Sequence, residues 1–386
     1  MKNPAEQYPE KVEFTFTLNV PQRQTPERID AFISRSIEHA SRSRVQRAIE
    51  RGTVTVNGKP TKSNYKIRPG DVIHVLVRKP PPLELIPENI PLDILFEDEH
   101  LIVINKMPGM LVHPGIGNRS GTLVNAVLWH LGQREAVPVL GNRESLADYD
   151  DTDDDGESDG DDGMEDGILE TPDSSPSEFL SAQAVRPGIV HRLDRDTSGV
   201  MVVGKNYATT LHLSNQFAQR IVQREYVALA WGVMQDDAML IETNIGRSTR
   251  DRRLYAVVQR NGKYAATQVA VVERYNCATL ITCKLHTGRT HQIRVHTSWK
   301  QHPLVGDKEY GGADSVLNGI HHAFRPQARQ VLLTIQRQAL HARLLEFVHP
   351  ATRQPMKFTT PVPEDFLSAI RTVRPTEAGP LPPCLC

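Results

Sequence analysis

The fold assignment depends on residues 188–199, which read Gly188-Ile-Val-His-Arg-Leu-Asp-Arg-Asp-Thr-Ser-Gly199. Six consecutive positions, 191–196, hold two carboxylates, two arginines and a histidine. The apolar residues 200–203 follow and are predicted to form a buried strand. A neighbouring guanidinium favours the ionised form of a carboxylate, which is the form that a nucleophile or a base requires. Asp194 is therefore the first candidate for a catalytic group, against the alternative of a polar surface turn.

A hydrolase triad of His191, Asp194 and Ser198 is not expected from this segment. Such triads bring together residues from separate segments, whereas these three share one loop. Ser198 also does not lie in a Gly-x-Ser-x-Gly elbow. Nucleophilic chemistry through Asp194 is the better interpretation of the cluster.

A second polar cluster spans residues 284–296, which we expect to be a glycine-containing turn after a strand. His291 and His296 are five positions apart, and no carboxylate or thiol accompanies them, so we predict no metal site. Arg289 offers a fixed bidentate donor for phosphate or carboxylate groups. The cluster is interpreted as an anion-binding segment, with a solvated basic loop as the alternative.

The charge of the chain is unevenly distributed. Its formal net charge is -1, but residues 144–178 contain 16 acidic and no basic side chains, so the remaining residues hold 45 basic and 30 acidic ones. This basic remainder favours a polyanionic partner. Arg247 belongs to a basic segment interleaved with Tyr255 and Tyr264, a pattern typical of RNA contacts through phosphates and stacked bases. No apolar run of membrane-spanning length and no signal peptide is recognised, so we expect no membrane association and a cytoplasmic location.

The N-terminal residues predict a small module of two helices followed by strands. Residues 12–20 alternate apolar and polar side chains, as in a strand with one buried face. Thr25 and Ser43 are expected to cap the two helices that follow. Residues 26–79 carry 12 basic and 5 acidic side chains, with Arg44 and Arg47 on the second helix, away from its apolar face. Both arginines are predicted to bind RNA phosphates.

We expect four regions along the chain. The N-terminal module spans residues 12–79, a proline-rich linker spans 80–91, a catalytic domain spans 92–375 and a tail spans 376–386. Residues 142–184 interrupt the catalytic domain with an acidic insertion, which is predicted to be disordered because it contains too few large apolar residues to bury. Two roles are open for this insertion, an inert solvated loop, which its composition favours, and an RNA mimic.

These motifs together resemble one known family. His191-Arg-Leu-Asp-Arg-Asp-Thr-Ser-Gly199 and Thr287-Gly-Arg-Thr-His-Gln-Ile-Arg-Val-His296 look like signatures of the RluA family of RNA pseudouridine synthases. Further segments agree as well: Asn105–Gly109, Val112–Gly115, Gly306-Asp307 with Tyr310–Gly312, and Arg337–Ala342 with His349-Pro350. Val112–Asn118 and Gly121-Thr122 are closest to the RluD-like branch. Residues 26–79 are similar to an S4 RNA-binding domain. The resemblance implies an α+β fold, in which a small S4-like domain precedes a catalytic domain with a largely antiparallel central sheet.

The resemblance also implies roles for particular residues. Asp194 matches the family's catalytic Asp, and Arg294 matches the basic residue that pairs with it. Tyr226 matches the tyrosine that packs on the target uracil, and Arg192 matches the arginine that fills the gap left by the flipped base. His191, Arg289 and Arg247 are added as expected substrate contacts.

The implied function is conversion of specific uridines in large-subunit (23S) ribosomal RNA to pseudouridine, free or in a pre-ribosomal particle. Because isomerisation transfers no electron and adds no water, no cofactor or metal is expected. A monomer is expected. Two alternatives are left open, a synthase directed at transfer RNA and a non-catalytic RNA-binding factor for ribosome assembly.

Overall fold

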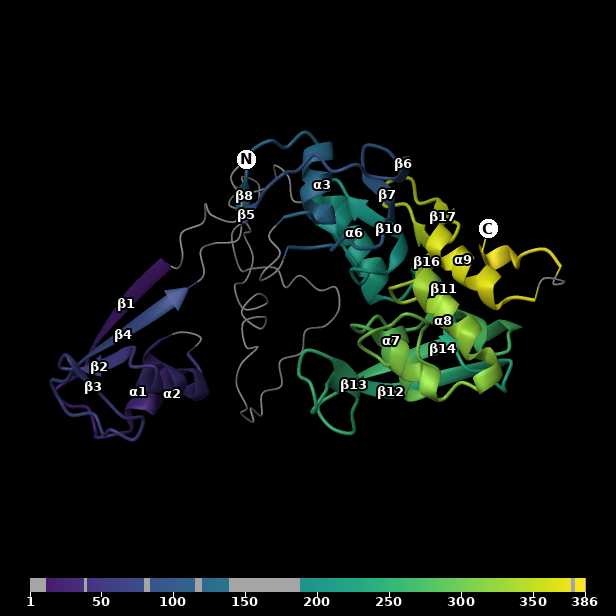
Figure 1. Ribbon diagram of the computed structural model, residues 1–386. Helices are drawn as coiled ribbons and strands as arrows, with labels where there is room; N and C mark the ends of the chain where they lie inside the picture. Colours follow the sequence, from purple (N-terminus) through teal and green to yellow (C-terminus); the bar gives the residue numbers. More distant parts are fainter. Residues whose placement is uncertain are drawn as a thin grey trace, which may run out of the picture. The chain divides into compact units, whose positions relative to one another are not determined.

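The computed structural model describes residues 12–37, 40–79, 84–114, 120–138, 188–375 and 379–385. These residues form two compact units, one N-terminal and one that begins at Glu84 (Figure 1). The predicted disordered insertion, 142–184, lies outside the described residues, as do parts of the predicted linker and tail.

The N-terminal unit is a four-stranded antiparallel sheet with two helices packed on it. The helices are α1 (Ile29–Ser36) and α2 (Arg42–Glu50). The strands, in sheet order, are β1 (Val12–Asn19), β4 (Val72–Lys79), β2 (Val54–Val56) and β3 (Lys59–Pro60). The apolar face predicted for each helix is buried in one core, which includes Ile29, Ile33, Val45 and Ile49.

The predicted caps of these two helices were wrong. Arg28, not Thr25, precedes α1, and its side chain makes no capping bond. Ser41, not Ser43, caps α2, because its hydroxyl accepts a hydrogen bond from the backbone N–H of Arg44. Ser43 already lies inside the first turn of α2, where a side chain cannot act as the cap.

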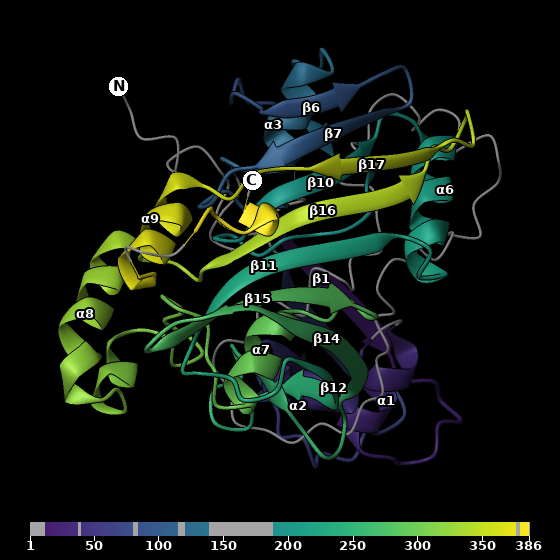
Figure 2. The same ribbon diagram turned by 90° about the vertical axis from the view of Figure 1, so that its right-hand side faces the viewer.

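The second unit is built on one large curved sheet, whose strands can be followed in Figure 2. All its strand pairs are antiparallel except β10 with β16, so the predicted largely antiparallel sheet is confirmed. In sheet order the strands are β13 (Tyr255–Val257), β12 (Ala238–Arg247), β14 (Lys263–Arg274), β15 (Ala278–Leu285), β11 (Gln223–Trp231), β16 (Leu340–Val348), β10 (Ser198–Gly204), β7 (Leu101–Lys106) and β6 (Ile94–Glu97). Off this path, β17 (Pro355–Thr359) pairs with β16, and β9 (Gly188–Ile189) pairs with β10; β5 (Glu84–Leu85) and β8 (Val137–Pro138) form a separate pair.

The two faces of the sheet bury different clusters. On β11, Tyr226 and Ala228 face one cluster, whereas Val227 and Leu229 face the other, as the alternation of a strand requires. Helices α8 (Arg325–Thr334) and α9 (Glu364–Val373) pack together over the second cluster. Helix α7 (Gln292–Trp299) packs against β12, β13 and β14, and its residue Ile293 belongs to the first cluster.

The remaining α-helices, α3 (Leu123–His130) and α6 (Tyr207–Ala218), lie near β7 and β10. Three short 3₁₀ turns belong to the side of the second cluster: η2 (Asp314–Asn318), η3 (His322–Phe324) and η4 (Pro383–Leu385). Helix α3 begins directly after Thr122, whose hydroxyl caps it. Throughout the described ranges, no helix has the length and apolar character needed to cross a membrane.

The start of β10 requires a glycine at position 199. Gly199 has φ +122°, and a Cβ there would lie 2.1 Å from the carbonyl oxygen of Ala342 on β16. This close approach occurs where β10 and β16 pair in parallel, directly after the turn that carries Asp194. The sequence Ser198-Gly199 therefore fixes where the turn ends and the sheet begins.

Candidate active site

Asp194 lies in the turn between β9 and β10. A hydrogen bond of 3.1 Å from the Thr197 backbone N–H to the Asp194 carbonyl oxygen closes the turn. The preceding residue, Leu193, is buried in the first apolar cluster and anchors the turn to the sheet. The Asp194 side chain is 17% exposed, so its carboxylate can be reached although most of it is enclosed.

Arg294 on α7 faces this carboxylate from 100 residues further along the chain. Its Nη1 lies 3.4 Å from Asp194 Oδ2. The guanidinium is buried and donates two hydrogen bonds to Asp307, of 2.7 and 2.8 Å, and one of 2.5 Å to Glu309. Burial alone would lower the pKa of Arg294, but Asp307 and Asp194 raise it above its ordinary value. A fixed positive charge therefore stands beside Asp194, as the sequence predicted.

The other oxygen of the same carboxylate faces a histidine. His291 Nε2 lies 3.7 Å from Asp194 Oδ1. The other ring nitrogen, Nδ1, is 2.8 Å from the hydroxyl of Tyr310. Asp194 is thus the point where three separate segments meet, the 191–199 turn, the start of α7 and the 306–310 loop.

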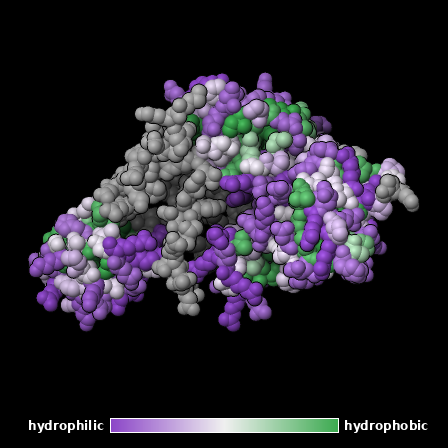
Figure 3. Space-filling view, viewed as in Figure 1, coloured by the Kyte–Doolittle hydropathy of each residue, from purple (hydrophilic) through white to green (hydrophobic). Residues whose placement is uncertain are grey.

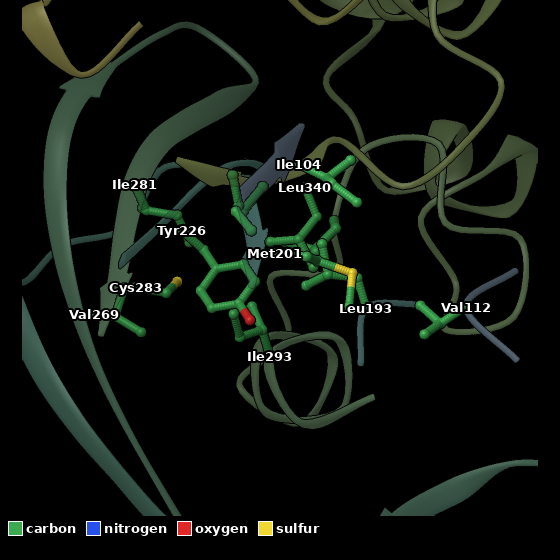
Figure 4. Close-up of a cluster of buried hydrophobic side chains, with 14 of the residues drawn as sticks. Ile104, Val112, Leu193, Met201, Tyr226, Val269, Ile281, Cys283, Ile293 and Leu340 are labelled. Atoms are coloured by element: carbon green, nitrogen blue, oxygen red, sulfur yellow. The ribbon is translucent and has the colours of Figure 1, made fainter. Parts of the chain in front are cut away.

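Tyr226 lies beneath this turn, with 7% of its surface exposed. Its neighbours in the first cluster include Leu193, Met201, Cys283 and Ile293, and its hydroxyl points towards Ile293 in Figure 4. Burial raises the pKa of Tyr226, and the negative charge of Asp194 raises it further.

Lys106, at the end of β7, supports the backbone of the turn. Its buried Nζ donates to the carbonyl oxygens of Met107, Met110 and Arg195, at 2.9, 2.8 and 2.9 Å. Burial lowers the pKa of Lys106 to about 7, while Asp196 and Asp194 act to raise it. Because three carbonyl acceptors match the three protons of an ammonium group, we assign the charged form. These contacts give Lys106 a structural role in the turn.

The predicted substrate-binding residues of the second unit are placed differently from one another. The Nε2 of His191 accepts a hydrogen bond of 3.0 Å from the Val202 backbone N–H, and its ring stacks on Phe217. Burial lowers the pKa of His191 to about 3, so its imidazole is neutral. Arg192 is exposed beside it on the turn. The predicted contact of His191 with substrate stays a prediction.

Arg247 and Arg289 lie near the β12–β13 end of the sheet. The Arg247 guanidinium lies 4.6 Å from the centre of the Tyr255 ring, and Arg289 Nε donates to the Tyr264 carbonyl oxygen. Figure 3 shows hydrophilic side chains gathered over this end. Arg44 and Arg47 belong to α2 in the N-terminal unit.

Three residues that contact Arg294 or His291 had no predicted role. Asp307, Glu309 and Tyr310 all lie in the 306–310 loop, and Asp307 Oδ1 also accepts the backbone N–H groups of Glu309 and Tyr310. The available signal was the Gly306-Asp pair followed by Tyr310, which the family resemblance includes without a role. The segment after Leu285 is also more regular than predicted, since Arg294 is on a helix.

The part of the chain that is described contains no group of three or more His, Cys, Asp or Glu side chains able to hold a metal ion. The groups that face the Asp194 carboxylate are instead a guanidinium and an imidazole. Such a pair can hold a partly exposed carboxylate in its ionised form.

Comparison with known proteins identifies the family of this chain. Residues 100–299 match the family model for RNA pseudouridylate synthases, and residues 27–73 match that for the S4 domain. The chain belongs to the RNA pseudouridine synthase family. It is therefore an isomerase, and the predicted family and α+β fold with an S4-like domain are confirmed.

Its relatives cover nearly the whole chain. An "uncharacterized RNA pseudouridine synthase" of Chlorobaculum parvum is 42% identical over 92% of this chain and 98% of its own. A second one, from Bacillus subtilis, is 36% identical over 92% of this chain and 96% of its own. A "ribosomal large subunit pseudouridine synthase D" of Xylella fastidiosa is 35% identical over 95% and 94%.

Proposed function

We propose that this pseudouridine synthase modifies specific uridines of large-subunit ribosomal RNA and uses Asp194 as its catalytic residue. The observation that carries the proposal is the pairing of Asp194 with the buried guanidinium of Arg294. The large-subunit substrate is supported by the name of the Xylella fastidiosa relative and others like it.

The reaction rearranges one nucleoside and leaves its atom count unchanged. The bond between N1 of uracil and C1′ of ribose breaks, the freed base rotates, and a bond forms between C5 and C1′. The proton on C5 leaves and N1 gains one. A carboxylate held ionised in a mostly enclosed site can attack the target nucleotide and later leave it, which is nucleophilic catalysis. Fixed positive charge at Arg294 stabilises that carboxylate each time it is released.

The target uridine has to leave its stack before Asp194 can reach it, at a cost of about a few kcal/mol. Arg192 is exposed on the same turn, in a position suited to occupy the space that the base vacates. Tyr226, beneath the turn, supplies an aromatic edge for the extruded uracil. Both roles, and a substrate contact by His191, are part of this proposal.

RNA binding is assigned to two basic regions. One is the β12–β13 end with Arg247 and Arg289, and the other is α2 with Arg44 and Arg47 in the S4-like domain. We assign residues 12–79 to that domain, 80–91 to a linker, 92–375 to the catalytic domain and 376–386 to a tail. The protein is proposed to act as a monomer in the cytoplasm, without a cofactor, on free RNA or a pre-ribosomal particle.

Tritium release from RNA labelled at C5 of uridine tests the activity directly, because the C5 proton is lost only when the base is rejoined through C5. The intact protein should release tritium, and Asp194→Asn should abolish release while RNA affinity changes by less than about threefold, since Asn keeps the shape but not the charge. Comparable release by the variant would contradict the assignment of Asp194. Binding without release by the intact protein would instead favour the assembly factor.

The RNA class is tested by mapping pseudouridines in cells that lack the gene. Loss of sites in large-subunit ribosomal RNA is expected. Loss of sites only in transfer RNA would favour the alternative synthase.

A further inference from the structure

His291 connects the catalytic carboxylate to the 306–310 loop. Its Nε2 lies 3.7 Å from Asp194 Oδ1, and its Nδ1 lies 2.8 Å from the Tyr310 hydroxyl. The backbone N–H of Tyr255 donates a hydrogen bond of 3.1 Å to that same hydroxyl. Four groups thus follow one another, from the Tyr255 amide to the Asp194 carboxylate.

The Tyr310 hydroxyl determines which ring nitrogen of His291 carries the proton. Since the hydroxyl already accepts from the Tyr255 amide, its own proton is available to a second partner. Among the described residues, His291 Nδ1 is the acceptor within reach of it. When Nδ1 accepts that proton, a neutral imidazole carries its own proton on Nε2.

The opposite tautomer would be unfavourable at the other end of the ring. It would place the bare lone pair of Nε2 towards Asp194 Oδ1, two acceptors facing each other in a mostly enclosed site. A doubly protonated ring is disfavoured too, because burial lowers the pKa of His291 below its ordinary value despite the raising effect of Asp194. The hydrogen-bond direction is thus from Tyr255 through Tyr310 and His291 to Asp194.

This series of hydrogen bonds cannot deliver protons to Asp194, because it ends on the backbone amide of Tyr255. A backbone N–H does not ionise near neutral pH, so no proton can be replaced from that end. What the chain can do is hold one N–H in a fixed direction. The 3.7 Å separation is longer than a hydrogen bond, but catalytic contacts in substrate-free enzymes are often long and tighten when substrate binds.

The backbone at His291 is itself unusual. His291 has φ 56° and ψ 19°, in the left-handed region, directly before the first residue of α7. Its ring packs edge-on against Tyr255 and Tyr310. Asp307, which binds Arg294, also accepts the backbone N–H of Tyr310. The 306–310 loop therefore orients both His291 and Arg294, one for each oxygen of Asp194.

We propose that His291 is a positioning residue of the pseudouridine synthase reaction, whose Nε2–H, directed by Tyr310, holds Oδ1 of Asp194 while Arg294 holds Oδ2. With both oxygens restrained, the plane of the carboxylate is fixed towards the flipped nucleotide. Misplacement of a reacting group by about 1 Å can cost about a hundredfold in rate. The proposal rests on the function assigned to Asp194 above.

Two amide replacements of His291 separate this role from a purely structural one. His291→Gln can place an amide N–H where Nε2 was, whereas the shorter side chain of His291→Asn ends near the position of Nδ1. Asn, however, adopts the left-handed conformation more readily than Gln. If His291 serves only the backbone, Asn is the better replacement; if the Nε2 donor matters, Gln is.

We expect His291→Gln to retain more activity than His291→Asn in the tritium-release assay, as the loss of the Nε2 donor requires. His291→Asn should lower kcat by about ten- to a hundredfold with KM for RNA within about twofold, whereas His291→Gln should keep kcat within about threefold of the wild-type protein. The melting temperatures should follow the opposite order. Equal kcat values for both variants and the wild-type protein, or a higher kcat for Asn than for Gln, would overturn the proposal.

Tyr310→Phe tests the tautomer. In ¹⁵N-histidine spectra of the full chain, the His291 signals, identified by their loss in His291→Asn, should show Nδ1 unprotonated and Nε2 protonated, and the Phe variant should lose this pattern. In kinetics, Tyr310→Phe should lower kcat in the wild-type background but not in His291→Asn. A proton on Nδ1 in the wild-type protein would overturn the proposal. Failure of the wild-type protein to release tritium would instead contradict the function itself.

Discussion

Each oxygen of the Asp194 carboxylate faces a different nitrogen, Nη1 of Arg294 and Nε2 of His291. The guanidinium is in turn fixed by Asp307, which is 1% exposed and binds it through both carboxylate oxygens. Breaking one side of such a buried pair leaves a charge without its partner, at a cost of about 3–5 kcal/mol. The stability of the protein and the position of the Asp194 carboxylate therefore depend on the same side chain.

Asp307→Asn should accordingly lower both stability and turnover. Asn has one acceptor oxygen in place of two and no charge, so Arg294 is no longer held in its present orientation. We expect kcat to fall by about ten- to a hundredfold and the free energy of unfolding by about 3 kcal/mol. Tritium release and urea unfolding measure the two effects.

The matched control is Glu309→Gln. Glu309 contacts the same guanidinium but is 50% exposed, so its removal should cost less than about 1 kcal/mol. Equal losses from the two variants would contradict the importance of the buried pair.

The sequence predicted the pairing of Asp194 with Arg294 but not the residues that orient these two side chains. Asp194 and Arg294 could be named because each lies in a long motif of a known family. Asp307 and Tyr310 act through hydrogen bonds to residues 13 and 19 positions away, and no local pattern reveals such partners. The helical conformation of α7 was not predicted, because its apolar residues Ile293 and Val295 are two positions apart, as they would be in a strand.

At the scale of elements, the closest contact is between β10 and β16. Gly199→Ala should be strongly destabilising, because the new methyl group would meet the Ala342 carbonyl oxygen at 2.1 Å. This contact and the strain of φ +122° should together lower the free energy of unfolding by about 3 kcal/mol or more.

Gly132→Ala separates the two causes. Gly132 also has a positive φ, +87°, but a Cβ there would have nothing within 4 Å. Gly132→Ala should lower the free energy of unfolding by about 1 kcal/mol, which reflects backbone strain alone. A similar loss at both glycines, measured by urea unfolding, would mean that the β10–β16 contact can relax.

Two histidines buried against the sheet give the protein an acid-sensitive stability. Burial lowers the pKa of both His296 and His341 to about 4, and hydroxyl groups of Thr243 and Ser198 contact their rings. The unfolded chain takes up these protons near pH 6.5 but the folded one does not, so stability should fall as the pH falls from about 6.5 towards 4. Between pH 6.5 and 5 the loss should be about 2 kcal/mol per histidine.

Urea unfolding at pH 7 and pH 5 measures this loss. His341→Gln should be less stable than the wild-type protein at pH 7 but should lose less on acidification, because one titrating group is gone. An equal loss in both proteins would contradict the role of His341.

Strands and helices were largely predictable from the sequence because their apolar periods are clear. The alternation before residue 20 and the run at 200–203 both have the predicted structure. The caps of α1 and α2 were not predictable in this way, since α1 begins after Arg28 without a side-chain cap, and both Ser41 and Ser43 lie at the start of α2. The parallel pairing of β10 with β16 joins residues more than 140 positions apart, and no local pattern predicts it.

At the scale of the whole molecule, the basic α2 helix and the catalytic unit are expected to contribute separately to RNA binding. Replacing Arg44 and Arg47 by Ala should weaken binding and flatten its salt dependence, because each lost phosphate contact removes about 0.9 from the slope of log K against log salt. Turnover at saturating RNA should be unchanged. Filter binding at several salt concentrations measures the slope.

Arg329→Ala is the control for this prediction. Arg329 is exposed on α8, which covers the face of the sheet opposite to the cluster beneath Asp194. Its replacement should leave the slope as it is. An unchanged slope in the Arg44 and Arg47 variant would mean that α2 does not contact phosphates.

The order of strands in the large sheet also determines when a newly synthesised chain can become active. β10, directly after the catalytic turn, lies between β7 and β16, and β16 ends at Val348. A nascent chain that stops short of Leu340 lacks the strand that pairs with Ser198 and Gly199 of β10 and with one side of β11. Such exposed strand edges promote aggregation, and distant pairings form slowly. Active enzyme should therefore arise only after β16 has been synthesised, and ribosome-bound fragments ending before β16 should have no activity.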